Sequence, residues 1–148
     1  MAAPASYIDP RGPRFGAGIT TAVVIVVILT GSGWLLAAQA AVFAIGALAG
    51  LKYAPYGILF RRFVRPRLAP PAELENEAPP RFAQGVGTVF ALVGAIGYLT
   101  GVTVLGVVAA GLALAAAFLN VAFDYCLGCE VYLLFRRSVP RRRPTVQG

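Results

Sequence analysis

Between Phe82 and Phe123 the chain reads FAQGVGTVFALVGAIGYLTGVTVLGVVAAGLALAAAFLNVAF, and none of these residues is charged. A second uncharged segment, from Phe15 to Leu51, reads FGAGITTAVVIVVILTGSGWLLAAQAAVFAIGALAGL. The two segments contain 42 and 37 residues, so as α-helix they would be about 63 and 55 Å long at about 1.5 Å per residue. The hydrocarbon core of a bilayer is only about 30 Å thick. Each segment is therefore expected to cross a membrane twice.

The composition also indicates a membrane protein. Of the 148 residues, 58% are hydrophobic, and the mean hydropathy is +0.74. A chain of this length cannot bury so much apolar surface in a water-soluble core. A lipid bilayer is therefore the expected environment.

Glycine-containing turns divide both segments. Gly31-Ser32-Gly33 interrupts the first and Thr100-Gly101-Val102-Thr103 interrupts the second, because glycine favours turns over helix interiors. The sequence therefore predicts an all-α membrane protein with four transmembrane helices and additional short interfacial helices. The predicted spans are Phe15 to Thr30, Trp34 to Leu51, Phe82 to Leu99 and Val104 to Phe123.

The cations all lie on one side of this arrangement. The thirteen Lys and Arg residues precede the first span, separate the second from the third, or follow the fourth. The positive-inside rule then places both termini and the central loop in the cytoplasm. Attraction of these cations to anionic headgroups accounts for the net charge of +7. We therefore expect the lipid bilayer, and not a nucleic acid, as their partner.

The two hairpins resemble each other in sequence. Pro13-Arg14-Phe15 opens the first and Pro80-Arg81-Phe82 the second, while Phe60-Arg61-Arg62 follows the first and Phe135-Arg136-Arg137 the second. We interpret this as a duplication, with the copies related by an axis along the membrane normal because both start and finish inside. Coincidence is the alternative, because short Arg-Phe and Phe-Arg-Arg strings are common at membrane edges. The single membrane domain is thus divided into a first hairpin repeat (13–62), a Pro- and Glu-rich cytoplasmic linker (63–79), a second hairpin repeat (80–137) and a basic tail (138–148).

Small residues recur at helical spacing within the predicted spans, as in Ala91 and Ala95 or Ala109 and Ala113. Such spacing allows helices to approach closely in lipid. We expect these residues to pack inside a four-helix bundle. Homo-oligomerisation through the same faces is the alternative.

Cys126-Leu127-Gly128-Cys129 contains the only two cysteines, where the second uncharged segment gives way to an Arg-rich tail. Two cysteines at this spacing can close a small disulfide, with Cα atoms within about 7 Å. A thiolate at the start of a helix is stabilised by free backbone N–H groups. Three interpretations are open: thiol redox chemistry, a metal held by four thiolates from two chains, or packing without chemistry. We assign no metal site to the single chain.

Cys126 and Cys129 are therefore the candidate catalytic residues. Gly128 is expected to bend the chain before a short interfacial helix from Val131 to Arg137. Cys129 would follow the expected bend and precede the expected helix, so the free N–H groups of that helix favour Cys129, while the charge of Glu130 opposes it. By analogy with redox C-x-x-C motifs, in which the first cysteine usually attacks, we expect Cys126 to be the nucleophile.

Asn120, Asp124 and Glu130 are candidate supporting residues. Asn120 and Asp124 are one helical turn apart and should share a face. Asp124 adjoins the end of a span, where its carboxylate would either be solvated at the membrane edge or accept a proton near the cysteines. Glu130 follows Cys129 directly, and its charge opposes formation of a neighbouring thiolate.

Missing residue types exclude several reaction classes. The chain has no histidine, which excludes a Ser-His-Asp triad and a histidine-ligated haem. It also lacks a phosphate-binding glycine loop followed by lysine, which argues against nucleotide hydrolysis. We expect no cofactor.

The sequence resembles a family of small bacterial integral membrane proteins known as a domain of unknown function. The resemblance rests on Asp9 to Phe15, Pro80 to Gln84, Asn120, and the string Cys126 to Glu130 followed by Tyr132. It implies a location in the bacterial cytoplasmic (inner) membrane. Members of that family are similar to proteins encoded near thioredoxin-like and sulfur-transfer proteins, which favours thiol chemistry by association.

Two functions from different classes follow. In the first, Cys126 and Cys129 alternate between dithiol and disulfide and exchange with a thioredoxin-like or sulfur-transfer partner. In the second, the protein is a non-enzymatic carrier, channel or assembly factor whose cysteines are structural. Whether the chain is an enzyme is left open between them.

Overall fold

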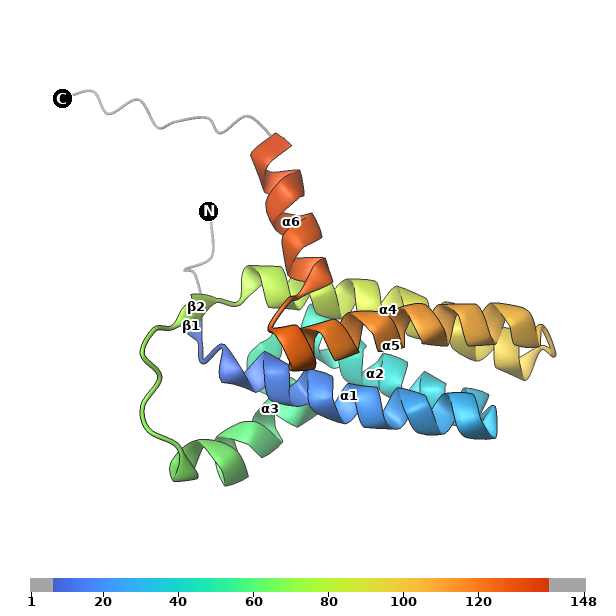
Figure 1. The fold of residues 1–148 in the computed structure, drawn as a ribbon, viewed down its shortest axis with the longest axis horizontal. Helices are drawn as coiled ribbons and strands as arrows, with labels where there is room; N and C mark the ends of the chain where they lie inside the picture. Colours follow the sequence, from blue (N-terminus) through green and yellow to red (C-terminus); the bar gives the residue numbers. More distant parts are fainter. Residues whose placement is uncertain (1–6, 139–148) are drawn as a thin grey trace.

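The computed structural model describes residues 7–138, which are almost entirely helical (Figure 1). The α-helices are α1 (Arg11–Thr30), α2 (Gly33–Leu48), α3 (Pro55–Leu59), α4 (Ala78–Leu99), α5 (Thr103–Phe123) and α6 (Leu127–Ser138). Shorter elements flank α3: the 3-10 helices η1 (Leu51–Tyr53) and η3 (Arg65–Arg67), and a π-helical turn η2 (Phe60–Val64). The strands β1 (Tyr7–Ile8) and β2 (Glu75–Asn76) form one antiparallel pair. The predicted all-α class is therefore confirmed.

Three of these helices are long and apolar enough to cross a membrane. They are α1, α4 and α5, with 20, 22 and 21 residues. The apolar helix α2 is shorter, with 16 residues, or about 24 Å at 1.5 Å per residue. It ends at Leu48, three residues before the predicted end of the second span, because Gly50 adopts a φ of 112° and starts the turn into η1.

The predicted turns are found in the structure. Gly31 has a φ of 66° and Gly101 a φ of 85°, values in or near the left-handed region that glycine adopts without steric cost. Ser32 caps α2, because its side-chain oxygen accepts a hydrogen bond from the N–H of Leu35 at 3.2 Å. The charge-free segments are thus divided where the sequence indicated.

Each hairpin packs mainly against the other hairpin. The helix α2 lies along α4, and α1 lies along α5, while α1 and α2 have few contacts with each other. Glycines set the closest approaches: a Cβ on Gly94 would lie 2.7 Å from a methyl of Leu36, and one on Gly97 would lie 2.5 Å from the nitrogen of Gly106. The core consists of Val24, Val27, Leu36, Ala40, Phe43, Ala91, Ala95 and Ala110. Small residues therefore serve internal packing, as predicted.

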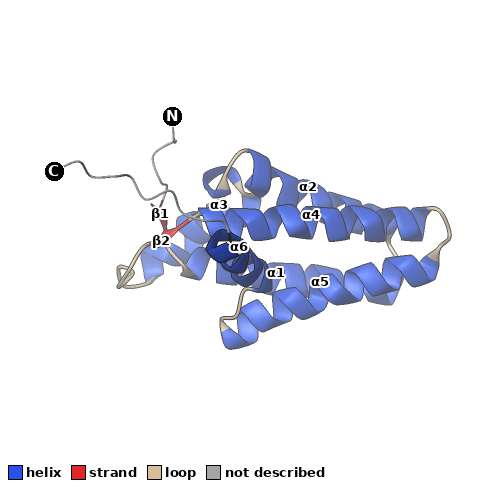
Figure 2. Cartoon of the chain, turned by 90° about the horizontal axis from the view of Figure 1, so that it is seen from above, coloured by secondary structure: helices blue, strands red, loops and turns tan. Residues whose placement is uncertain are grey.

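The short helices gather at the end of the bundle where α1 and α4 begin, and the β1–β2 pair lies at the same end (Figure 2). Figure 1 shows α6 leaving the bundle across its long axis, on the side away from α3. The segment predicted as a linker contains η3 and β2. Of the predicted basic tail, residues 139–148 lie outside the described part of the chain.

A chain of polar side chains is buried between α1, α2 and α3. Gln39, with only 2% of its surface exposed, donates from Nε2 to Oγ1 of Thr20 at 3.4 Å and accepts from the hydroxyl of Tyr56 at 2.5 Å. Burial raises the pKa of the Tyr56 hydroxyl, and its hydrogen bond to Gln39 partly offsets this. The network holds α3 against the bundle, because separation of Tyr56 from Gln39 would leave the buried amide of Gln39 without a donor, which is costly.

Candidate dithiol site

A left-handed residue carries the chain from α5 to the dithiol. The helix ends at Phe123, and Asp124 has a φ of 53°, a conformation that aspartate tolerates better than most residues. The N–H of Tyr125 then bonds to the carbonyl oxygen of Leu119 at 3.2 Å, which closes the C-terminus of α5. The chain turns away from the direction of α5 here and enters α6 after two further residues (Figure 1).

Cys126 precedes the first residue of α6 and caps that helix. Its Sγ accepts the N–H of Cys129 at 3.2 Å, and its carbonyl oxygen accepts the N–H of Glu130 at 3.0 Å. Cys126 and Cys129 are joined by a disulfide, with Cα atoms 5.1 Å apart. The predicted proximity of the two cysteines is therefore confirmed, and both are half-buried.

Gly128 has a different role from the one predicted. It lies within the first turn of α6, which begins at Leu127 and not at Val131, so it does not bend the chain. A Cβ at Gly128 would lie 2.5 Å from the Cβ of Ala83, so glycine is required for α6 to contact α4. The prediction was wrong because the chain turns earlier, at Asp124.

An aromatic contact holds α6 one turn further along. The rings of Phe82 and Tyr132 pack with centroids 5.5 Å apart. Arg136 donates to the hydroxyl of Tyr132 at 3.1 Å and lies 5.9 Å from the centre of its ring. Together with the Gly128 contact, this fixes the disulfide beside the start of α4.

The three candidate supporting residues occupy different elements of the structure. Glu130 is in the first turn of α6, where the helix dipole favours a carboxylate. Asp124 is exposed and follows the end of α5, so the helical face expected to be common to Asn120 and Asp124 is interrupted. Asn120 remains inside α5. The structure thus joins the two cysteines, and the supporting roles of the other three residues stay predictions.

Two unlike faces run along α6. Leu127, Val131, Leu134 and Phe135 follow the i, i+4, i+7, i+8 spacing of one helical stripe, and all four are exposed. Cys129 and Arg136 lie on the other side, since two residues correspond to roughly half a turn. Cys129 is therefore on the side of α6 away from the stripe, one turn before the exposed Leu133, whereas Cys126 adjoins Leu127 in the chain.

Within residues 7–138, no group of three or more cysteine and carboxylate residues is close enough to hold a metal ion. Sequence reasoning also missed a cavity on the α3 side of the bundle, lined in part by Arg61 and Arg65. These arginines were interpreted only as topology signals. Their four-residue spacing on one helical face was the signal that could have revealed the cavity.

Comparison with known proteins gives one match. No curated protein and no solved structure shows significant similarity to the chain. A family model described as "Domain of unknown function (DUF4395)" matches residues 8–137. This range includes both hairpins, the cysteine pair and most of α6. The chain therefore belongs to the DUF4395 family.

Proposed function

We propose that the protein is a four-span protein of the bacterial cytoplasmic membrane that exchanges Cys126 and Cys129 between dithiol and disulfide with a cytoplasmic thioredoxin-like or sulfur-transfer partner. The observation that carries the proposal is the capping position of Cys126. Its sulfur receives the N–H of Cys129 at the start of α6. This is the environment in which a thiolate is stabilised as a leaving group and as a nucleophile.

The exchange proceeds through a mixed disulfide. A partner thiolate attacks Sγ of Cys126, the bond to Cys129 breaks, and Cys129 leaves as a thiolate that takes a proton from water. The partner's second thiolate then attacks the partner sulfur bonded to Cys126. The partner becomes a disulfide, and Cys126 is released as a thiolate beside the N–H of Cys129. Two electrons pass to the cysteine pair, and the reverse sequence returns them.

Four spans are supported by the pairing of the helices and by charge. The shorter helix α2 lies along α4, and no charged residue occurs between Phe15 and Leu51. A helix of 16 residues is accommodated by local thinning of the bilayer or by snorkelling of flanking side chains. Lys52 follows α2 in η1, and Arg81, in the first turn of α4, donates to Leu48 at the end of α2, so both cations lie at the same end of the bundle. The positive-inside rule makes this end cytoplasmic.

The orientation of α6 supports presentation of the disulfide to the cytoplasm. Because α6 crosses the long axis of the bundle (Figure 1), it would lie along the membrane surface when α1, α4 and α5 span it. Its exposed stripe of Leu127, Val131, Leu134 and Phe135 then contacts lipid. Cys129, on the opposite side, faces water and a soluble partner.

Trapping in intact cells tests the exchange. A Cys129→Ser variant keeps the attacking sulfur and lacks the resolving one, so it should accumulate a mixed disulfide with a cytoplasmic protein on non-reducing gels. The Cys126→Ser variant should accumulate much less, and a variant with both substitutions none.

Two results would count against the proposal. If neither single variant forms an adduct and the disulfide of the purified protein resists a reduced thioredoxin, the cysteines are structural. That outcome would favour the carrier, channel or assembly function. A stronger adduct with Cys126→Ser than with Cys129→Ser would reverse the roles assigned to the two sulfurs.

A further inference from the structure

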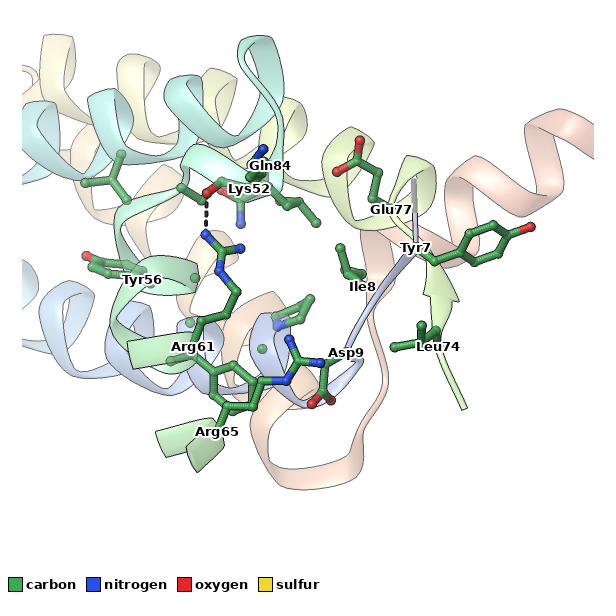
Figure 3. A pocket seen from close by; sticks show the side chains of 18 residues that line it. Tyr7, Ile8, Asp9, Lys52, Tyr56, Arg61, Arg65, Leu74, Glu77 and Gln84 are labelled. Carbon is green, nitrogen blue, oxygen red and sulfur yellow. Dashed lines mark hydrogen bonds between the residues drawn. The ribbon is translucent and has the colours of Figure 1, made fainter. Parts of the chain in front are cut away.

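A cavity of about 390 Å³ opens at the end of the bundle that contains α3. Its wall is built from the β1 strand, the first turns of α1, the segment from η1 to η3, and the start of α4. Figure 3 shows Arg61, Ile8, Glu77 and Gln84 around its empty centre. The volume lies within the range of about 300–1,000 Å³ typical of small-molecule sites. Neither cysteine contributes to the lining, and α6 lies on the other side of the bundle.

The charges around this cavity are unbalanced. The two carboxylates in the lining already have partners: Asp9 pairs with Arg11 at 2.8 Å and Glu77 with Arg81 at 3.9 Å. Hydrogen bonds from Arg11 hold the pKa of Asp9 below its usual value, and the charge of Arg65 lowers it further. Asp9 is therefore ionised at neutral pH and fully committed to its neighbours.

Arg61 and Arg65 form no ion pair with any residue from 7 to 138. Arg61 is half-buried, and its guanidinium donates to the backbone oxygen of Lys52, which fixes the side chain beside the cavity (Figure 3). Most of its N–H donors remain available. A guanidinium held in this way is suited to bind the oxygens of a phosphate.

Part of the wall is apolar and reaches into the helical bundle, beside polar lining residues that include Lys52, Tyr56 and Gln84. Val42 comes from α2, while Leu51 and Phe60 come from the elements that follow it. Both Leu51 and Phe60 are buried. A ligand that fills the cavity therefore needs an anionic group at one end and an apolar portion at the other.

We propose that this cavity binds the phosphate of an anionic phospholipid, with Arg61 and Arg65 contacting the headgroup and Val42, Leu51 and Phe60 contacting the start of the acyl chains. Basic pockets between helices at the cytoplasmic end of a bundle are suited to such headgroups. The site is separate from the cysteine pair, so a Cys129→Ser variant should bind the lipid as the wild type does.

Native mass spectrometry of the full chain in detergent tests the site with three probes: dioleoylphosphatidylglycerol, dioleoylphosphatidylcholine and inorganic phosphate. Phosphatidylglycerol should be retained in preference to phosphatidylcholine. An Arg65→Glu variant should bind it about tenfold or more weakly, because a charged hydrogen bond is replaced by repulsion. The matched control is Arg67→Glu, since Arg67 is exposed in the same segment and outside the lining.

A second variant distinguishes binding of a phospholipid from binding of free phosphate, and it leaves the charge of the cavity unchanged. Val42→Phe fills the apolar part of the cavity, so it should weaken phosphatidylglycerol binding while its melting temperature in detergent shows that it is folded. The proposal would be overturned if Arg65→Glu and Arg67→Glu weakened phosphatidylglycerol binding equally, or if the wild type retained the two lipids equally. Binding of inorganic phosphate that depends on Arg65, without binding of phosphatidylglycerol, would overturn the lipid assignment and point to a soluble phosphate compound.

Discussion

Arg14 and Arg81 occupy the fourth positions of α1 and α4, and each donates to carbonyl oxygens near the end of a helix in the other hairpin. Arg14 donates from Nε to Val121 at 3.1 Å. Arg81 donates to Ala47 at 2.7 Å and to Leu48 at 2.8 Å. The last carbonyls of a helix lack intrahelical donors and carry partial negative charge. The two arginines therefore join α1 to α5 and α4 to α2.

An aromatic contact accompanies each of these arginines. Phe15 packs on Phe60 with ring centroids 5.8 Å apart, and Phe82 packs on Tyr132 at 5.5 Å. The interplanar angles are 46° and 44°. The two contacts are alike in kind, but Phe60 aligns with Phe135 in the sequence repeat, and Tyr132 lies three residues before Phe135. The ring partners are therefore not equivalent residues, and the duplication stays a prediction.

The duplication predicts that residues 13–62 and 80–137 superpose by a rotation about the membrane normal in an experimental structure. The match should be closest at Arg14 and Arg81, which are equivalent in the two repeats. It should be poorest between the helices of each hairpin, because Gly97 and Gly106 bring α4 and α5 together while α1 and α2 have few contacts. Hairpins related by an inverted axis, or by none, would rule out the duplication.

Removing the arginine contacts should destabilise the bundle. We expect Arg81→Gln to lower the free energy of unfolding by about 1–3 kcal/mol, because a charged donor to helix-end carbonyls is lost. Arg14→Gln should cost less, since it removes one hydrogen bond where Arg81 makes two. Denaturant unfolding in detergent measures both. The control Arg137→Gln removes an exposed arginine, and a loss as large as that of Arg81→Gln would argue against the specific contact.

Substitution of Gly128 should displace α6 from α4. A Gly128→Ala Cβ would lie 2.5 Å from the Cβ of Ala83, and such overpacking costs about 1–3 kcal/mol. Gly111→Ala is the matched control, because nothing lies within 4 Å of the new Cβ there. Ala83→Gly in the same chain should restore part of the loss in thermal stability. If Gly128→Ala melts at the wild-type temperature, the close contact of α6 with α4 is incorrect.

The hydroxyl of Tyr56 should give the protein a distinctive alkaline response. Tyr56→Phe leaves Oε1 of the buried Gln39 without its donor, at a cost of about 1–3 kcal/mol near neutral pH. Burial raises the pKa of Tyr56 in the folded state, so the unfolded chain loses its proton first. Wild-type stability should therefore fall as the pH rises beyond about 10, the usual tyrosine value.

The variant lacks this titration, so the stability difference between wild type and Tyr56→Phe should shrink above that pH. Unfolding curves between neutral and alkaline pH measure the difference. Tyr53→Phe, which alters an exposed tyrosine, controls for removal of a hydroxyl. If the difference in unfolding free energy between wild type and Tyr56→Phe stayed constant with pH, this would contradict the burial of the Tyr56 hydroxyl.

Reporter fusions test the four-span topology. Alkaline phosphatase is active only outside the cytoplasm, so fusions after Ser32 and after Gly101 should be active. A fusion after Arg143 should be inactive, while a fluorescent protein at that position should fluoresce. An active phosphatase after Arg143 would reverse the orientation or change the number of spans.

Most of the helical layout could be predicted from the sequence. The uncharged segments and the turns at Gly31 and Gly101 depend on local composition and on the conformational freedom of glycine. The ends of α1, α4 and α5 at Thr30, Leu99 and Phe123 accordingly match the predicted ends. The early end of α2 was missed. Gly50 has a positive φ that ends the helix, but the residues on either side of it are apolar, so the sequence does not show that the helix stops there.

The sequence alone determined that this is a helical chain suited to a membrane, where its hydrophobic segments turn, and that its two cysteines lie close enough to bond. Tertiary structure alone decided that α1 pairs with α5 and α2 with α4, that Gly128 lies against Ala83, and that Arg61 and Arg65 line a cavity. The physical reason is the range of the interactions. Turns and disulfide spacing depend on residues adjacent in the chain, whereas helix pairing and cavities depend on how side chains distant in sequence fit together.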